Sequence, residues 1–81
     1  MTIQKESYDC IPKLGDVVKV LSVARKNDEI LVGERGIIIE IDMDYEFPYN
    51  IQFLNRNIQK INSSLGELLW KRENFVVLSY D

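Results

Sequence analysis

The chain has 81 residues, of which 46% are apolar and 28% charged, so it fits a single folded domain and is too short for a doubly wound nucleotide-binding sheet. Ten Lys and Arg residues against 13 Asp and Glu give a formal net charge of −3, which disfavours a general nucleic-acid binder. With no histidine and one cysteine, Cys10, the sequence excludes Ser-His-Asp and Cys-His catalysis, His-ligated zinc and an internal disulfide. No apolar stretch approaches the roughly 20 residues that span a bilayer, and we therefore expect a cytoplasmic protein with no membrane contact.

The first expected strand covers residues 16–23 and follows a turn signal at Gly15-Asp16. Four of its eight residues are valine, whose β-branched side chain suits a pleated strand better than a helix. Because side chains alternate between the two faces of a strand, Val18 and Val20 are expected to face the core.

A polar excursion over residues 24–35 separates this strand from the next. Its apolar residues 30–32 either return as a short strand or pack as a flap, and Gly33 and Gly36 bracket a tight turn. The apolar run at residues 36–42 is the strongest strand signal in the chain. It fits either a central strand covered on both faces or a bulged strand whose register shifts midway.

The next strand, residues 49–54, follows a connection over residues 42–48 and has the clearest alternation, with Tyr49, Ile51 and Phe53 on one face. This pattern is typical of a half-buried strand.

Residues 55–67 are polar and read as a loop in which Ile58 and Ile61, three residues apart, indicate at most one helical turn. A short strand is then expected at residues 68–70 and a last strand at residues 75–80. The four residues between these strands leave room for one short helical turn.

Four motifs carry a resemblance to a known fold. They are Gly15-Asp16 before Val18 and Val20, the turn Gly33-Glu34-Arg35-Gly36 before Ile38 and Ile41, the strand Phe47–Phe53, and the run Trp70–Leu78. Their order resembles the SH3-like small β-barrel superfamily, which includes KOW-type domains, photosystem I subunit IV, the variable chain of ferredoxin–thioredoxin reductase and barrels encoded by phages. The expected fold is therefore all-β: a single five-stranded SH3-like barrel over residues 14–81, with one short helical turn before the last strand. Residues 1–13 are expected to be an N-terminal extension or an extra edge strand.

The connection before the fourth expected strand combines aromatic and acidic side chains, a pattern typical of surfaces that anchor and steer a protein partner. The candidate partner-binding residues are Asp42, Asp44, Tyr45, Glu46, Phe47 and Tyr49, together with Arg35 in the preceding turn. In the alternative interpretation, Phe47 and Tyr49 close the end of the barrel and Tyr45 alone is exposed. The spacing Asp42-x-Asp44-x-Glu46 lacks the glycine and the distal carboxylate of a calcium loop, so no metal site is expected.

A second candidate surface is cationic. Its residues are Arg56, Lys60, Lys71 and Arg72, and they would contact phosphates if the chain bound nucleic acid as KOW domains do. Trp70 is interpreted either as a lid on the core or as a binding aromatic, with the core position favoured.

We therefore expect a small non-catalytic module that acts by protein–protein interaction through residues 42–49 and the excursion at residues 24–35. The resemblance to phage-encoded barrels implies docking on a host protein. The alternatives are nucleic-acid binding and a structural role as a subunit of a larger complex. Neither an enzymatic activity nor a cofactor is expected, and the chain is expected to be a monomer or a weak homo-oligomer.

Overall fold

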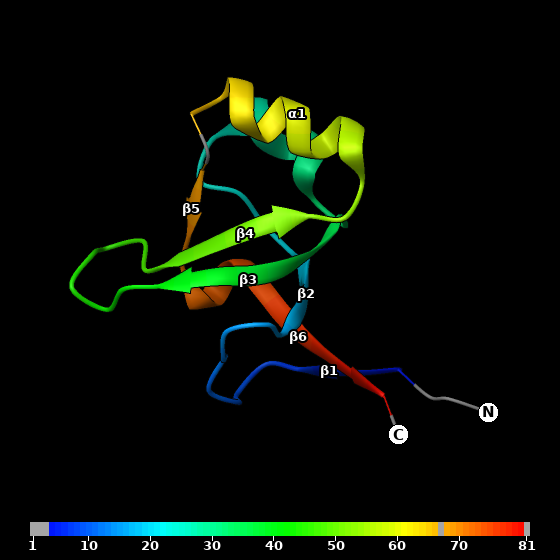
Figure 1. The fold of residues 1–81 in the computed structure, drawn as a ribbon, viewed down its shortest axis with the longest axis vertical. Coiled ribbons are helices and arrows are strands. Elements are labelled where there is room, and N and C mark those ends of the chain that lie inside the picture. The colour runs from blue at the N-terminus through cyan, green and yellow to red at the C-terminus, as the bar shows by residue number, and fades with distance from the viewer. Residues whose placement is uncertain (1–3, 67, 81) are drawn as a thin grey trace.

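A computed structural model describes residues 4–66 and 68–80 of the chain. Six strands form one antiparallel sheet in the spatial order β1-β6-β2-β3-β4-β5. The strands are β1 (Gln4–Ser7), β2 (Val17–Val20), β3 (Arg35–Ile41), β4 (Tyr49–Phe53), β5 (Leu69–Trp70) and β6 (Phe75–Tyr80). Three helical segments join them: the 3-10 helices η1 (Lys26–Leu31) and η2 (Arg72–Asn74), and the α-helix α1 (Arg56–Ser64). The sheet curls, so that β3 and β4 run at a steep angle to β2 and β6 (Figure 1).

The all-β class is confirmed, but the expected closed barrel of five strands is wrong. The sheet has six strands, and its two end strands, β1 and β5, do not pair with each other in the described part of the chain. The additional strand is β1, which corresponds to the extra edge strand, one of the two alternatives left open for residues 1–13. No periodicity in the sequence indicates it, because its partner lies about 70 residues away. β5 is only two residues long, and among the described strands it pairs with β4 alone. The short helical turn expected before the last strand is confirmed as η2.

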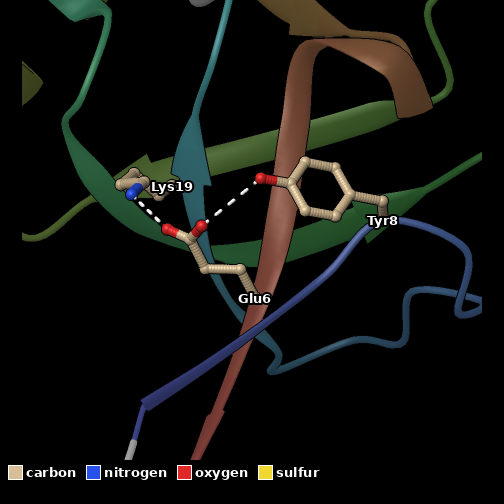
Figure 2. A network of polar contacts seen from close by, with 3 residues as sticks. All are labelled: Glu6, Tyr8 and Lys19. Atoms are coloured by element: carbon tan, nitrogen blue, oxygen red, sulfur yellow. Dashed lines mark hydrogen bonds and ion pairs between the residues drawn. The ribbon is translucent and has the colours of Figure 1, made fainter.

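Polar contacts fasten β1 to the sheet. It runs antiparallel to β6, with Gln4 opposite Tyr80. Figure 2 shows Glu6 between Lys19 and Tyr8: its carboxylate forms an ion pair with Lys19 Nζ and accepts a hydrogen bond of 3.3 Å from the Tyr8 hydroxyl. The hydrogen bond from Lys19 is the main reason why the pKa of Glu6 lies below its usual value.

The core lies on the concave side of the curl, where the alternation of β2 and β4 places it. Val18 and Val20 are buried as expected, although β2 ends at residue 20 rather than 23. Tyr49, Ile51 and Phe53 are all buried, so the inward face predicted for β4 is confirmed. The other buried hydrophobic residues of this core are Leu31, Ile38, Trp70, Phe75 and Val77.

β3 is the bulged strand of the two alternatives. Its register with β4 shifts between Ile38 and Glu40, and Ile39, which lies between them, is half exposed. Near the start of β3, Gly36 allows β4 to approach closely. A Cβ at Gly36 would lie 2.7 Å from the Gln52 carbonyl oxygen, so a larger residue there would force the strands apart.

The excursion over residues 24–35 contains η1 instead of a returning strand. Leu31 is fully buried in the core, whereas its neighbours Ile30 and Val32 are exposed. One inward side chain therefore ties the excursion to the core, and the flap interpretation is the closer of the two alternatives.

The segment interpreted as a polar loop forms α1, which has nine residues rather than a single turn. Asn55 caps the helix: its Oδ1 accepts hydrogen bonds from the backbone N–H groups of Asn57, at 3.0 Å, and Ile58, at 3.4 Å. Near the other end, buried Asn62 accepts a hydrogen bond of 3.2 Å from the Leu68 N–H. Within the described ranges, no helix is long and apolar enough to cross a lipid bilayer.

Candidate functional site

A groove of about 500 Å³ lies beside the edge strand β5. Its apolar lining residues are Val23, Ala24, Phe47, Leu68, Leu69 and Trp70. They come from the stretch before η1, the β3–β4 connection, the residues after α1, and β5 itself, which are segments far apart in the sequence. A concave apolar space of this size is within the range of ligand-binding pockets.

An ion pair stands in one wall of the groove. The Asp28 carboxylate is 3% exposed, and its Oδ2 accepts a hydrogen bond of 3.0 Å from Arg25 Nε. A buried carboxylate is retained in a fold when a charge-assisted hydrogen bond compensates its lost hydration. The Arg25 side chain is 62% exposed, so its guanidinium faces solvent, and the buried Asp28 carboxylate neutralises its charge.

Trp70 forms part of the floor of the groove and also belongs to the core. It is 2% exposed and packs edge-to-face on Phe53, with ring centroids 6.1 Å apart. The core position favoured for Trp70 is therefore confirmed. Its indole Nε1–H has no hydrogen-bond acceptor, and it is the one buried side-chain nitrogen or oxygen of the described residues in that condition. A buried N–H group without an acceptor lowers the stability of the folded chain.

Asn74 of η2 connects two walls of the groove. Its Oδ1 accepts a hydrogen bond of 2.9 Å from the Lys71 N–H, and its Nδ2 donates one of 3.1 Å to Ser22 Oγ. The end of β5 is thereby linked to the stretch that leads into η1.

The β3–β4 connection is an exposed acidic loop, which we call the acidic loop and define as residues 42–48. Asp42 closes its base: the Asp42 N–H donates to the Pro48 carbonyl at 2.8 Å, and Asp42 Oδ1 accepts from the Asp44 N–H at 3.1 Å. Tyr45 is 63% exposed and Met43 is 70% exposed. The loop therefore presents large side chains to solvent.

The structure does not bring all the candidate partner-binding residues together. Phe47 lines the groove next to the acidic loop, but Tyr49 is buried against Phe75, with ring centroids 5.1 Å apart, and cannot contact a partner. Tyr49 is thus a correction to the expected site: the alternation of β4 directs it into the core. Arg35 is also separated from the loop, because it begins β3 and the loop follows Ile41, roughly 20 Å along an extended strand.

The four cations expected to bind phosphate do not form one surface. Arg56 and Lys60 lie on α1 and line a second depression, between this helix and the strands β3 and β4. Lys71 instead contacts the acidic loop: its Nζ is 3.4 Å from Glu46 Oε1 and 5.0 Å from the centroid of the Phe47 ring.

Arg72 is a structural anchor for the N-terminal segment. Its guanidinium donates hydrogen bonds to three carbonyl oxygens, those of Ser7 at 3.1 Å, Cys10 at 3.2 Å and Phe75 at 2.8 Å. It also lies over the Phe75 ring, 5.2 Å from the centroid. A guanidinium used in this way joins β1 to β6, which the sequence alone could not distinguish from a phosphate contact.

Sequence reasoning identified Phe47 and the excursion that carries Asp28, but it missed the groove itself. The contributions of Ala24 and Leu68 depend on the fold, because the stretch before η1 and the residues after α1 meet only in three dimensions. The pair Leu68-Leu69 next to Trp70 is the one local signal, since two leucines and a tryptophan exceed what a two-residue strand can bury.

The groove, the acidic loop and the cations beside them are the candidate functional features of the described residues. Comparisons of the chain with models of protein families, with curated proteins and with solved structures find no match.

Proposed function

We propose that this chain is a small non-catalytic binding module that holds a protein partner in the groove beside β5 and on the acidic loop. The observation that carries the proposal is the groove of about 500 Å³, lined mainly by apolar side chains and bordered by an exposed loop. Protein interfaces combine a desolvated apolar centre with a polar rim, and the groove and the loop supply these two parts next to each other.

The exposed side chains of the loop support the same proposal. Tyr45 and Met43 are residue types that are enriched at protein interfaces, and both are mostly exposed. The carboxylates around them would raise the rate of encounter with a basic surface and select against an acidic one.

The composition of the groove supports binding rather than catalysis. Asp28 is the one carboxylate that lines the groove in the part of the chain that is described, and it is already paired with Arg25. Arginine does not give up its proton, so this pair is not the nucleophile–base or acid–base pair that is typical of catalytic sites.

We further propose that the curled sheet is an open relative of the SH3-like barrels. Support comes from the order of the elements: a first barrel strand β2, a long excursion, the β3–β4 hairpin, and the short η2 between β5 and β6. β2 lies between β3 and β6, so the first and last barrel strands are neighbours. An experimental structure that lacks the pairing of β2 with β6 would contradict this relationship.

Affinity capture with matched variants tests the proposed function. A Tyr45→Ala/Phe47→Ala double variant and a Leu69→Ser variant should each lose the partner that the unmodified chain retains from an extract of its source cell. A Leu14→Ser variant is the control, because Leu14 is 64% exposed and lies outside the groove. Circular dichroism verifies that each variant is folded. Unchanged capture by both groove variants would contradict the proposal.

A further inference from the structure

We infer that the occupant of the groove is an extended peptide segment that adds to the free edge of β5, inserts an apolar side chain into the groove, and carries Lys or Arg toward the acidic loop. This inference rests on the proposed function and specifies the chemistry of the partner. It follows from three independent features of the described residues: the edge of β5, the groove beside that edge, and the charge of the loop.

β5 offers an unpaired strand edge. It is the last strand of the sheet and pairs with β4 on one side, with Trp70 opposite Tyr49 (Figure 1). Side chains already bind the backbone at both ends of β5: Asn62 accepts from the Leu68 N–H, and Asn74 accepts from the Lys71 N–H. Pairing with an added strand is therefore confined to Leu69 and Trp70. Such edges bind extended peptides through main-chain hydrogen bonds.

The groove lies where a side chain of an added strand would enter. Successive side chains of a strand point to opposite faces, so one residue of the peptide would face the groove while its neighbours face solvent. The groove lining next to β5 is apolar at Ala24, Leu68 and Leu69, and these residues fit an aliphatic or aromatic side chain. Trp70 also lines the groove, so its indole N–H signal reports whether a side chain occupies that space.

The charge beside the groove selects a basic peptide. The acidic loop carries Asp42, Asp44 and Glu46, and Lys71 is the cation seen against them in the described structure. Glu46 remains 76% exposed although Lys71 lies near it, so its carboxylate is still open to a second cation. The ion pair of Asp28 and Arg25, which also lines the groove, has no net charge. It therefore does not determine the sign of the charge that the peptide must carry.

Nuclear magnetic resonance with synthetic peptides tests the inference. The probe is an acetylated and amidated nonapeptide of serine and threonine with one central leucine and a lysine two residues to either side. Trp70 is the only tryptophan of the chain, so its indole N–H gives a single signal. The peptide should shift that signal and the amide of Leu69, and give intermolecular backbone contacts to β5.

Two matched peptides separate the contributions of anchor and charge. Replacement of the leucine by alanine should abolish the shifts at Leu69 and Trp70. Replacement of both lysines by glutamate should weaken binding at least about tenfold, because the peptide then meets like charges on the acidic loop.

Variants of the chain give the complementary measurements. The triple variant Asp42→Asn/Asp44→Asn/Glu46→Gln keeps the side-chain oxygen at residue 42 and should lower the affinity for the lysine peptide about tenfold. Glu40→Gln is the control, since Glu40 is an exposed carboxylate of β3 outside the groove.

Each contrary result has a distinct meaning. Equal or tighter binding of the glutamate peptide at Leu69 would overturn the inference and leave the proposed function standing. Shifts at Leu69 that depend on protein concentration without any peptide would identify a second copy of the chain as the occupant and would also overturn it. If the lysine peptide moves neither signal, the inference fails. The proposed function fails only if both groove variants still capture the partner as the unmodified chain does.

Discussion

At one edge of the sheet, β1 lies along β6 and is fastened by the side chains of Lys19 and Arg72, whereas at the other edge the two-residue strand β5 borders an apolar groove. At the first edge, the polar contacts hold β1, a strand that contributes little to the core. The second edge contains Trp70, which is itself part of the core. An edge held by polar side chains can be loosened without unfolding the domain, while damage at β5 affects the whole molecule.

The strongest way to test this difference is to remove the indole at the β5 edge. Trp70→Ala should lower the free energy of unfolding by about 3–5 kcal/mol, because it leaves a large cavity beside Phe53. That is a large fraction of the stability of a small domain. Urea denaturation followed by far-ultraviolet circular dichroism measures it. A loss below about 1 kcal/mol would show that Trp70 does not support the core.

The corresponding change at the β1 edge is Arg72→Ala, with an expected loss of about 2–3 kcal/mol since three carbonyl oxygens lose a charged donor. Arg72→Lys should recover little, because an ammonium cannot reproduce the planar array of donors. Hydrogen exchange should show the loss concentrated in β1 and at Cys10. Uniform loss of protection across β3 and β4 would mean that this edge is not independent of the core.

A smaller effect is expected where the chain enters β5. Asn62→Ala removes the acceptor for the Leu68 N–H from a buried position and should cost about 1–2 kcal/mol. Asn57→Ala is the matched control, since Asn57 is an exposed residue of the same helix. Thermal unfolding of both variants compares them, and equal midpoints would show that Asn62 does not hold the edge in place.

The smallest effect is the pH dependence of β1. Because the pKa of Glu6 is lowered in the folded chain, its ion pair with Lys19 stabilises β1 fully above the usual pKa of a glutamate. That contribution is lost as the pH falls through this value toward the lowered one. The protection factors of the β1 amides, which are corrected for the slower intrinsic exchange in acid, should therefore fall on acidification in the unmodified chain and change less in Glu6→Gln. Identical profiles would show that the ion pair does not hold the strand.

The elements that local patterns specify were predictable. The alternation of Tyr49, Ile51 and Phe53 determines the inward face of β4, because each buried side chain is two residues from the next. The apolar run of β3 left two alternatives open, and the bulge beside Ile39 distinguishes them only through pairing with β4. Local sequence therefore predicted the central strands but not their register.

Long-range partners explain what could not be predicted. β1 exists because of β6, and the role of Arg72 depends on carbonyl oxygens at residues 7 and 10, which no spacing in the sequence relates to it. The groove, whose apolar lining comes from four separate segments, was not foreseen for the same reason. α1 was missed for a local reason, because Asn55 and Asn62 were interpreted as loop formers although Asn55 caps the helix and Asn62 is a buried acceptor.

The position of β6 between β1 and β2 has a consequence for synthesis of the protein on the ribosome. Residues 75–80 are translated after all the other strands, yet they pair with the two earliest ones. Until they emerge, the edge of the nascent β2 that later pairs with β6 is unpaired, and the valines of β2 lack their partners on β6. A premature stop before residue 75 would leave that edge available to other chains, so truncated products should aggregate or be degraded rather than accumulate as partial folds.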